Sequence, residues 1–249
     1  MPRMKFMNTE IDNLTMQEAL QAIDQVIHEN KSVYVVTPNV DHIVQLETNK
    51  KLQMVYKNAF LILTDGKPLQ WIACWYGTPI KEKISGSDLF PLLCKMAAEN
   101  GYKMFFLGAA EGIAAKAADN LTNKFPGLNV IGTYSPPLGF EKNCKELDKI
   151  KSIIKSLKPD ILIVGLGCPK QEYFMYQYCK DLEVPISFGL GASFDFEAGN
   201  IRRAPKWMSR HGLEWLFRIT QDPKRMLKRY FVDDCMIFRL AIKYKRAMK

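Results

Sequence analysis

The sequence predicts an α/β protein whose Rossmann-like, mostly parallel sheet is flanked by helices and followed by a C-terminal helical appendage. The first observation is that short apolar segments alternate with longer amphipathic ones between residues 32 and 188. Such alternation is typical of βαβ units, in which helices connect parallel strands. The second observation is that strand patterns stop at a glycine-rich loop over 189–199. We therefore expect an α/β domain over 1–195 and a helical appendage over 196–249.

Local patterns justify each element. Thr15-Met16-Gln17-Glu18 has the form of a capping box and precedes apolar residues at helical spacing, so a helix should begin there. Strands are expected at 32–37, 60–64, 103–107, 129–134, 160–164 and 184–188. Helices are expected at 15–30, from about 41, and at 50–58, 68–76, 89–98, 110–125, 142–157 and 169–179. In the tail, short helices should break at Pro205 and Pro223 before a longer helix from about 224.

The positive charge of the chain belongs to its C-terminal part. Residues 201–249 contain 14 Lys and Arg and 4 Asp and Glu. The other 200 residues contain 21 Lys and Arg and 22 Asp and Glu. An acidic or phosphorylated partner is therefore expected for the tail. No apolar run reaches the roughly 18 residues of a membrane span, and Met1–Phe6 lacks the apolar core of a signal peptide. We expect a cytoplasmic protein.

Cysteine and histidine spacing does not indicate a metal site. The six cysteines contain no C-x-x-C pair, and the three histidines are widely separated. Cys168 lies in a suspected site loop, but no His near it in the sequence marks it as an activated nucleophile. The acid-x-acid pair Asp195 and Glu197 has no supporting ligands, so a structural role in that turn is favoured. We expect no metal.

Polar and glycine-rich stretches follow the predicted strands. On a parallel sheet these strand ends converge at one edge, where ligands bind, and helix N-termini there attract phosphate. A nucleotide or another diphosphate is the expected ligand. Gly165-Leu166-Gly167-Cys168-Pro169-Lys170 lacks the third glycine of a dinucleotide fingerprint, and no P-loop is present. The stretches are 37–39, 65–66, 108–110, 132–134, 165–167 and 189–195.

For two residues at this edge, the sequence favours a contact with a ligand and a local structural role equally. Asp65 follows the apolar strand segment 60–64 and precedes Gly66, so its carboxylate either meets a substrate or caps the next helix. Gln171 falls in the first turn after Pro169, so it either faces the same edge or begins a solvated helix.

Taken together, the motifs form an ordered set that resembles the WecG/TagA/CpsF glycosyltransferase family over nearly the whole chain. This set is more specific than any single motif. Its N-terminal members are 37–39, 41–42, 63–66 and 85–89. Its central and C-terminal members are 106–108, 165–172, 194–195, 203–205, 212–215 and 222–225.

The resemblance implies an activity. Members move an N-acetylhexosamine from a UDP-sugar to a polyprenyl-diphosphate-linked sugar at the cytoplasmic membrane face. The Gram-positive branch transfers N-acetylmannosamine from UDP-ManNAc to undecaprenyl-diphosphate-linked GlcNAc, the committed step of wall teichoic acid synthesis. These enzymes are inverting, need no metal or cofactor, and suggest a homo-oligomer in solution. A related UDP-hexosamine or hexose transferase for another polysaccharide is the alternative.

The resemblance also implies residue roles. Asp65 matches the proposed general base. Thr37 and Gln171, the other two residues expected to be catalytic, match polar positions of the pocket for donor and acceptor. Lys83 and Lys228 stand where relatives have Arg, and lysine lacks the bidentate fork. The positions expected to bind substrate are Asn39, Lys83, Gly108, Gly132, Tyr134, Gly165, Gly167 and Asp195 on the catalytic domain, and Arg218, Arg225, Lys228 and Arg229 on the tail.

The basic tail has more than one interpretation. It can dock on an anionic membrane and close over the donor diphosphate. Alternatively, it is a helical subdomain packed on the sheet with a solvated basic face. A nucleotide-binding oxidoreductase would explain the α/β alternation but lacks its fingerprint. A nucleic-acid-binding module would explain the charge, but no base-reading motif accompanies it, so no nucleic-acid partner is expected.

Overall fold

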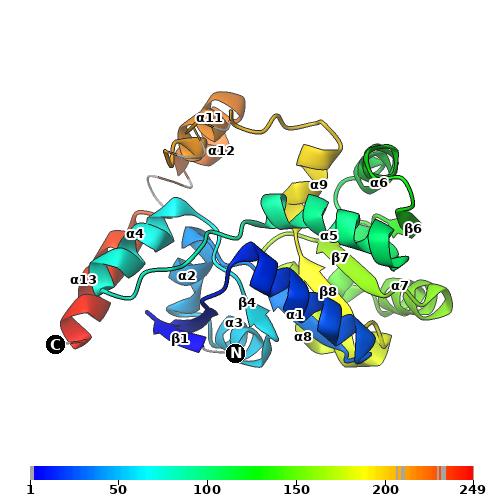
Figure 1. Ribbon diagram of the computed structural model, residues 1–249, viewed down its shortest axis with the longest axis horizontal. Helices are drawn as coiled ribbons and strands as arrows, with labels where there is room; N and C mark the ends of the chain where they lie inside the picture. Colours follow the sequence, from blue (N-terminus) through cyan, green and yellow to red (C-terminus); the bar gives the residue numbers. More distant parts are fainter. Residues whose placement is uncertain (1–2, 206, 209–210, 229, 231–233, 249) are drawn as a thin grey trace.

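A six-stranded parallel sheet forms the centre of the structure (Figure 1). The computed structural model describes residues 3–205, 207–208, 211–228, 230 and 234–248. Every neighbouring pair in the sheet is parallel, which confirms the predicted α/β class. In spatial order the strands are β4 (Leu61–Ile62), β3 (Val33–Val36), β8 (Ile186–Gly189), β7 (Ile161–Gly165), β5 (Lys103–Gly108) and β6 (Asn129–Tyr134).

Helices cover both faces of this sheet. The capping box predicted before the first helix forms, with the Glu18 backbone N–H donating to Thr15 Oγ1 at 3.2 Å. One apolar core contains residues of α1 (Met16–His28), α5 (Gly86–Asn100), α6 (Ile113–Lys124) and α9 (Gly191–Glu197). The other contains residues of α2 (Val40–Leu46), α3 (Lys50–Asn58), α4 (Lys67–Tyr76), α7 (Cys144–Leu157), α8 (Lys170–Leu182) and the short 3-10 helix η1 (Phe140–Lys142).

An N-terminal hairpin, β1 (Arg3–Phe6) and β2 (Thr9–Asp12), is a feature that the sequence patterns did not predict. Its strands are too short to give a clear alternation, and tertiary contacts hold them. Phe6 and Ile11 are fully buried. Asp12 Oδ2 accepts a hydrogen bond from the Ile62 backbone N–H at 2.8 Å, so the hairpin covers the edge strand β4.

The glycine-rich stretch after β8 was predicted as a loop, and this prediction is wrong for most of it. Residues Gly191–Glu197 form α9, and Phe194 is fully buried. A Cβ atom at Gly165 would lie 2.5 Å from the Phe194 ring, so the ring packs where Gly165 has no side chain. The glycines here allow close packing between a helix and the sheet.

The tail consists of helices among the described residues after 199, but the long helix predicted from about 224 is wrong. It is divided into α12 (Pro223–Lys228) and α13 (Met236–Ala247), which follow α11 (Glu214–Gln221). In Figure 1, α13 lies beside α4, while α11 and α12 stand farther from the sheet. Ile237 and Leu240 are buried, and Tyr76 Oη donates to the Ala241 carbonyl at 2.8 Å. Among the described residues, each helix is too short or too polar to cross a bilayer.

Candidate active site

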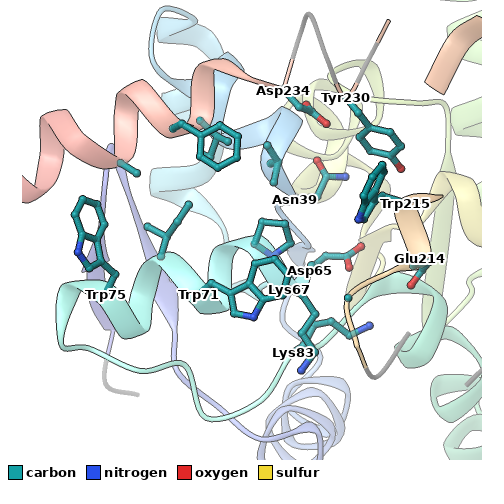
Figure 2. A pocket seen from close by; sticks show the side chains of 18 of the residues that line it. Asn39, Asp65, Lys67, Trp71, Trp75, Lys83, Glu214, Trp215, Tyr230 and Asp234 are labelled. Atoms are coloured by element: carbon teal, nitrogen blue, oxygen red, sulfur yellow. The ribbon is translucent and has the colours of Figure 1, made fainter. Parts of the chain in front are cut away.

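A cavity of about 800 Å³ opens at the carboxyl end of β4, between α4, α11 and α13 (Figure 2). Its polar end contains four residues predicted from the sequence: Asn39, Asp65, Lys83 and Arg218. Much of the remaining wall is apolar. This wall includes Val40, Pro68, Trp71, Ile72, Trp75, Trp215, Ile237, Phe238, Ala241 and Ile242.

Asp65 lies in this cavity because β4 ends just before it. Its backbone N–H donates to the Pro38 carbonyl at 2.8 Å, which ties it to the loop after β3. The reading of Asp65 as a helix cap is wrong. The N-cap of α4 is Gly66, which has no side chain to cap the helix and adopts φ 108°, a conformation that favours glycine. The Asp65 carboxylate is thus available to a ligand.

The surroundings of Asp65 suit a proton acceptor. Burial raises the pKa of its carboxyl to about 6, and the nearby acids Glu214 and Asp88 add to the rise. Attraction from Lys83 and Arg218 opposes it. A carboxyl with a pKa of about 6 is ionised at neutral pH yet more basic than an ordinary aspartate.

Two cations border the same carboxylate. Lys83 Nζ lies 3.2 Å from Asp88 Oδ2, and Arg218 Nη2 lies 2.7 Å from Glu214 Oε1. The Arg218 guanidinium also lies over the Phe196 ring, 5.4 Å from its centroid. These contacts hold positive charge at the polar end of the cavity, where an anionic group would be attracted.

Four polar side chains form a hydrogen-bonded chain beside the cavity, which we call the amide relay: Asn39, His42, Glu172 and Gln171. His42 Nδ1 lies 2.8 Å from Asn39 Oδ1, and His42 Nε2 lies 3.3 Å from Glu172 Oε1. Gln171 Nε2 donates to the same Glu172 oxygen at 2.8 Å. The relay joins the loop after β3 to the first turn of α8, and Gln171 is buried rather than part of a solvated helix start.

The contacts of His42 and Glu172 fix the orientation of the two amides in this relay. Burial alone would lower the pKa of His42, but hydrogen bonds with Cys168 and Glu172 and the negative charge of Glu172 raise it to about 10. The His42 backbone N–H donates to Asn39 Oδ1 at 3.3 Å. Asn39 therefore directs its carbonyl oxygen at His42 and keeps its NH₂ group for other partners, whereas Gln171 commits its NH₂ group and keeps its carbonyl oxygen.

Replacing Glu172 by Gln should lower kcat by roughly 10- to 100-fold, because a protonated His42 loses its counter-ion and the two amides lose their fixed orientation.

The same substitution should change the pH dependence of stability. The ion pair between His42 and Glu172 stabilises the fold fully below the usual His pKa of 6.5, and that stabilisation is lost as pH rises through about 10. Unfolding of the E172Q variant should therefore vary less between pH 7 and 10 than that of the wild type. Glu111→Gln, an exposed substitution, serves as control. An unchanged kcat in E172Q would show that the amide relay does not support catalysis.

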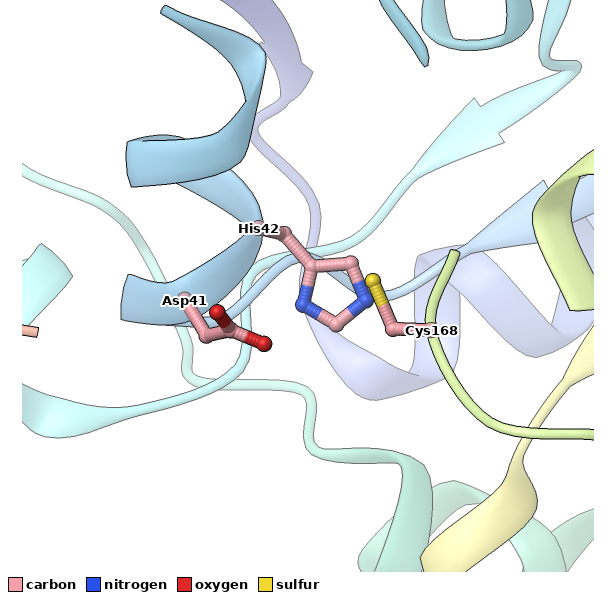
Figure 3. Close-up of side chains that lie close together, drawn as sticks. All are labelled: Asp41, His42 and Cys168. Atoms are coloured by element: carbon pink, nitrogen blue, oxygen red, sulfur yellow. The ribbon is translucent and has the colours of Figure 1, made fainter. Parts of the chain in front are cut away.

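Cys168 has a histidine beside it, contrary to the sequence interpretation. His42 is 126 positions away in the chain but adjacent in space (Figure 3). Gln45 Nε2 donates to Cys168 Sγ at 3.6 Å. Burial raises the pKa of the Cys168 thiol even though His42 lowers it, so the sulfur is a neutral thiol at pH 7.

Asp41, His42 and Cys168 each have one potential metal-ligand atom, and these atoms lie within 4.8 Å of one another. The wide spacing of the histidines in the sequence suggested that no such cluster forms, but folding brings His42 next to Asp41 and Cys168. However, both His42 nitrogens face partners, and a protonated imidazole cannot ligate a metal. The cluster fits a hydrogen-bonded network better than a metal site.

Several other predicted positions lie at the carboxyl edge of the sheet but outside the Asp65 cavity. Gly108 has φ 110°, and a Cβ atom there would collide with the Gly165 carbonyl oxygen, so the paired ends of β5 and β7 approach closely. Gly132 instead lies inside β6, paired with Phe105 of β5, so its prediction as a strand-end position is wrong. The remaining positions are Thr37 after β3, Tyr134 at the end of β6, Gly167 before α8 and Asp195 in α9.

The predicted tail residues separate in the structure. Arg218 reaches the cavity, whereas Lys228 is exposed at the end of α12 and is not part of the cavity wall. The Arg225 side chain and the whole of Arg229 lie outside the described part of the chain. Sequence reasoning missed Glu214, Glu172 and the role of His42. The signal for His42 was its position three residues after Asn39, where the two form a capping box.

Comparison with known proteins shows the family of the chain. The model of the glycosyl transferase WecG/TagA/CpsF family matches residues 4–249. An N-acetylglucosaminyldiphosphoundecaprenol N-acetyl-beta-D-mannosaminyltransferase of Bacillus spizizenii is 32% identical over 90% of this chain and 83% of its own. A protein of the same name from Staphylococcus aureus is 25% identical over 90% of this chain and 87% of its own. The chain therefore belongs to the WecG/TagA/CpsF glycosyltransferase family.

Proposed function

We propose that this protein is an inverting glycosyltransferase that moves N-acetylmannosamine from UDP-ManNAc to undecaprenyl-diphosphate-linked GlcNAc, in wall teichoic acid linkage-unit synthesis. The observation that carries the proposal is Asp65, a strand-end carboxylate with a pKa raised to about 6 beside two cations. The names of the Bacillus and Staphylococcus relatives support the choice of sugar and acceptor.

In the proposed reaction, the acceptor hydroxyl oxygen attacks the anomeric carbon as the bond from that carbon to the UDP oxygen breaks. The hydroxyl proton passes to the Asp65 carboxylate, and a positioned general base of this kind contributes roughly 10²–10⁴-fold in rate. The electron pair of the broken bond leaves with UDP. Arg218 and Lys83 stabilise the charge that grows on the leaving diphosphate.

The remaining predicted residues have supporting roles in this proposal. Thr37, Asn39 and Gln171 hold the reacting sugars, with the amide relay fixing the last two. The loops at the carboxyl ends of β5 and β7 receive the UDP. The chain's own cations carry the charge stabilisation, so the proposal includes neither a metal nor a cofactor.

The appendage over 196–249 is proposed to complete the site and to dock on an anionic membrane at the inner face of the cell membrane. Leu216 and Phe238 are exposed apolar residues on α11 and α13, and exposed lysines and arginines accompany them. Each basic residue near an anionic surface contributes about 1 kcal/mol. A homo-oligomer in solution is proposed on the family resemblance.

UDP release with a panel of UDP-N-acetylhexosamines and a lipid-diphosphate-GlcNAc acceptor tests the proposal, with and without a chelator. UDP-ManNAc should give the highest kcat/KM, and the chelator should not change it. Sedimentation with anionic and neutral vesicles tests docking, and only the anionic vesicles should carry the protein down. Turnover that requires both a different sugar and an added metal would contradict the proposal.

A further inference from the structure

The cavity that contains Asp65 continues into an apolar groove between α4 and α13. We use this name for six residues: Trp71, Ile72, Trp75, Phe238, Ala241 and Ile242. Figure 2 shows Trp71 and Trp75 on α4, with α13 alongside and Asp65 beyond Trp71. The groove and the proton acceptor thus share one continuous space.

Both walls of the groove present large apolar side chains to solvent. Trp71 and Trp75 are 57% and 51% exposed, and Phe238 and Ile242 are 70% and 47% exposed. Each pair is spaced four residues apart, so its members lie on one face of their helix. Two apolar ridges therefore face a common groove, and exposed apolar surface of this extent indicates a binding site.

Polarity changes along the cavity in one direction. The groove is apolar, and the far end contains Asp65, Lys83 and Arg218. Lys67 also lines the cavity, at the start of α4, four residues before Trp71 on the same helix face and two residues after Asp65. Within the described ranges Lys67 has no ion pair, in contrast to Lys83, which contacts Asp88.

We infer that this groove binds the first isoprene units of a polyprenyl diphosphate acceptor, and that Lys67 binds its diphosphate. The inference rests on the proposed function. A lipid-linked sugar has an apolar chain, then a diphosphate, then a sugar hydroxyl. Toward the N-terminus of α4 the cavity wall runs from Trp75 and Trp71 to Lys67 and then to Asp65, in the same order. Arg218 and Lys83 remain for the donor diphosphate.

A chain inside the groove differs from simple contact with a flat bilayer. The groove has two walls and leads to Asp65, whereas a bilayer surface would touch only the outer edges of α4 and α13. A single branched hydrocarbon chain fills such a space and packs against the indole faces. The groove should therefore discriminate acceptors by chain length even without a membrane.

The first experiment measures direct binding below the critical micelle concentration, without vesicles. Geranylgeranyl diphosphate should quench the tryptophan fluorescence of the full-length protein. Trp75→Gln combined with Ile242→Gln should weaken its Kd by about 10- to 50-fold, since each buried methylene contributes about fourfold to affinity. Lys67→Met should weaken binding of the diphosphate but not of geranylgeraniol. Trp207→Gln, an exposed tryptophan outside the groove, is the matched control and should keep the wild-type Kd.

The second experiment separates the inference from the proposed function. The kcat/KM ratio for a C20-diphosphate-GlcNAc acceptor over a short-alkyl one should fall about 10- to 50-fold in the W75Q/I242Q variant. Binding without transfer in the wild type would refute the proposed function and leave the groove assignment intact. Transfer with an unchanged ratio and an unchanged Kd in the variant would overturn the groove assignment. Loss of vesicle binding alone would also overturn it, in favour of a membrane contact.

Discussion

Replacing Asp65 by Asn should lower kcat by roughly 10²–10⁴-fold, the usual contribution of a positioned general base. The amide has nearly the same size as the carboxylate but cannot accept the hydroxyl proton. UDP release with saturating donor and acceptor measures the effect. Asp119→Asn, an exposed substitution on α6, is the matched control and should leave kcat unchanged.

The pH dependence and stability of the D65N variant distinguish catalysis from a structural role. Because burial raises the pKa of Asp65 to about 6, wild-type kcat/KM should rise about tenfold per pH unit below 6 and level off above it. A raised carboxyl pKa means that stability declines as pH rises from the unfolded value through about 6. At neutral pH the variant should therefore be at least as stable as the wild type. A large loss of both stability and turnover would contradict the role as base.

Replacing Arg218 by Met should lower kcat by about 10²–10³-fold, as is typical when one group that stabilises a developing negative charge is removed. The change also has a signature in pH. Arg218 lowers the pKa of Asp65 and Glu214 raises it, so the inflection of the pH profile should move above 6 in the variant.

The matched control for this prediction is Arg246→Met, in the last turn of α13 and exposed. It should keep both the rate and the pH profile of the wild type. Arg218→Lys should recover part of kcat, since it keeps the charge but loses the planar contact with Glu214 and Phe196. A wild-type pH profile in R218M would mean that Arg218 acts at a distance from Asp65.

The sheet could be predicted from the sequence because each strand and helix carries its own local pattern. The elements that were missed depend on contacts between distant residues. The hairpin is held by Asp12 against Ile62, and α9 is held by Phe194 against Gly165. In the tail, Ile237 and Leu240 of α13 are buried by contacts with the rest of the protein, which the local pattern does not reveal.

The candidate site could be predicted only in part, for the same reason. Asp65 could be proposed as a site residue from its position after a strand and from the family resemblance. The sequence could not decide between a ligand contact and a helix cap, and the structure decides because Gly66 is the N-cap of α4. The amide relay joins residues 39 and 42 to residues 171 and 172, so no local spacing reveals it. The groove joins α4 to α13, whose facing residues are about 165 positions apart in the chain, as in the bond from Tyr76 to Ala241.

The central claim is that Asp65 acts as a lone base in a single displacement at the anomeric carbon. The most direct test is the anomeric configuration of the product, measured by NMR after transfer from α-linked UDP-ManNAc to a GlcNAc-diphosphate-lipid acceptor. A single displacement predicts a β-linked product. An α-linked product would contradict it, because a single displacement from the face opposite the UDP oxygen inverts the anomeric carbon.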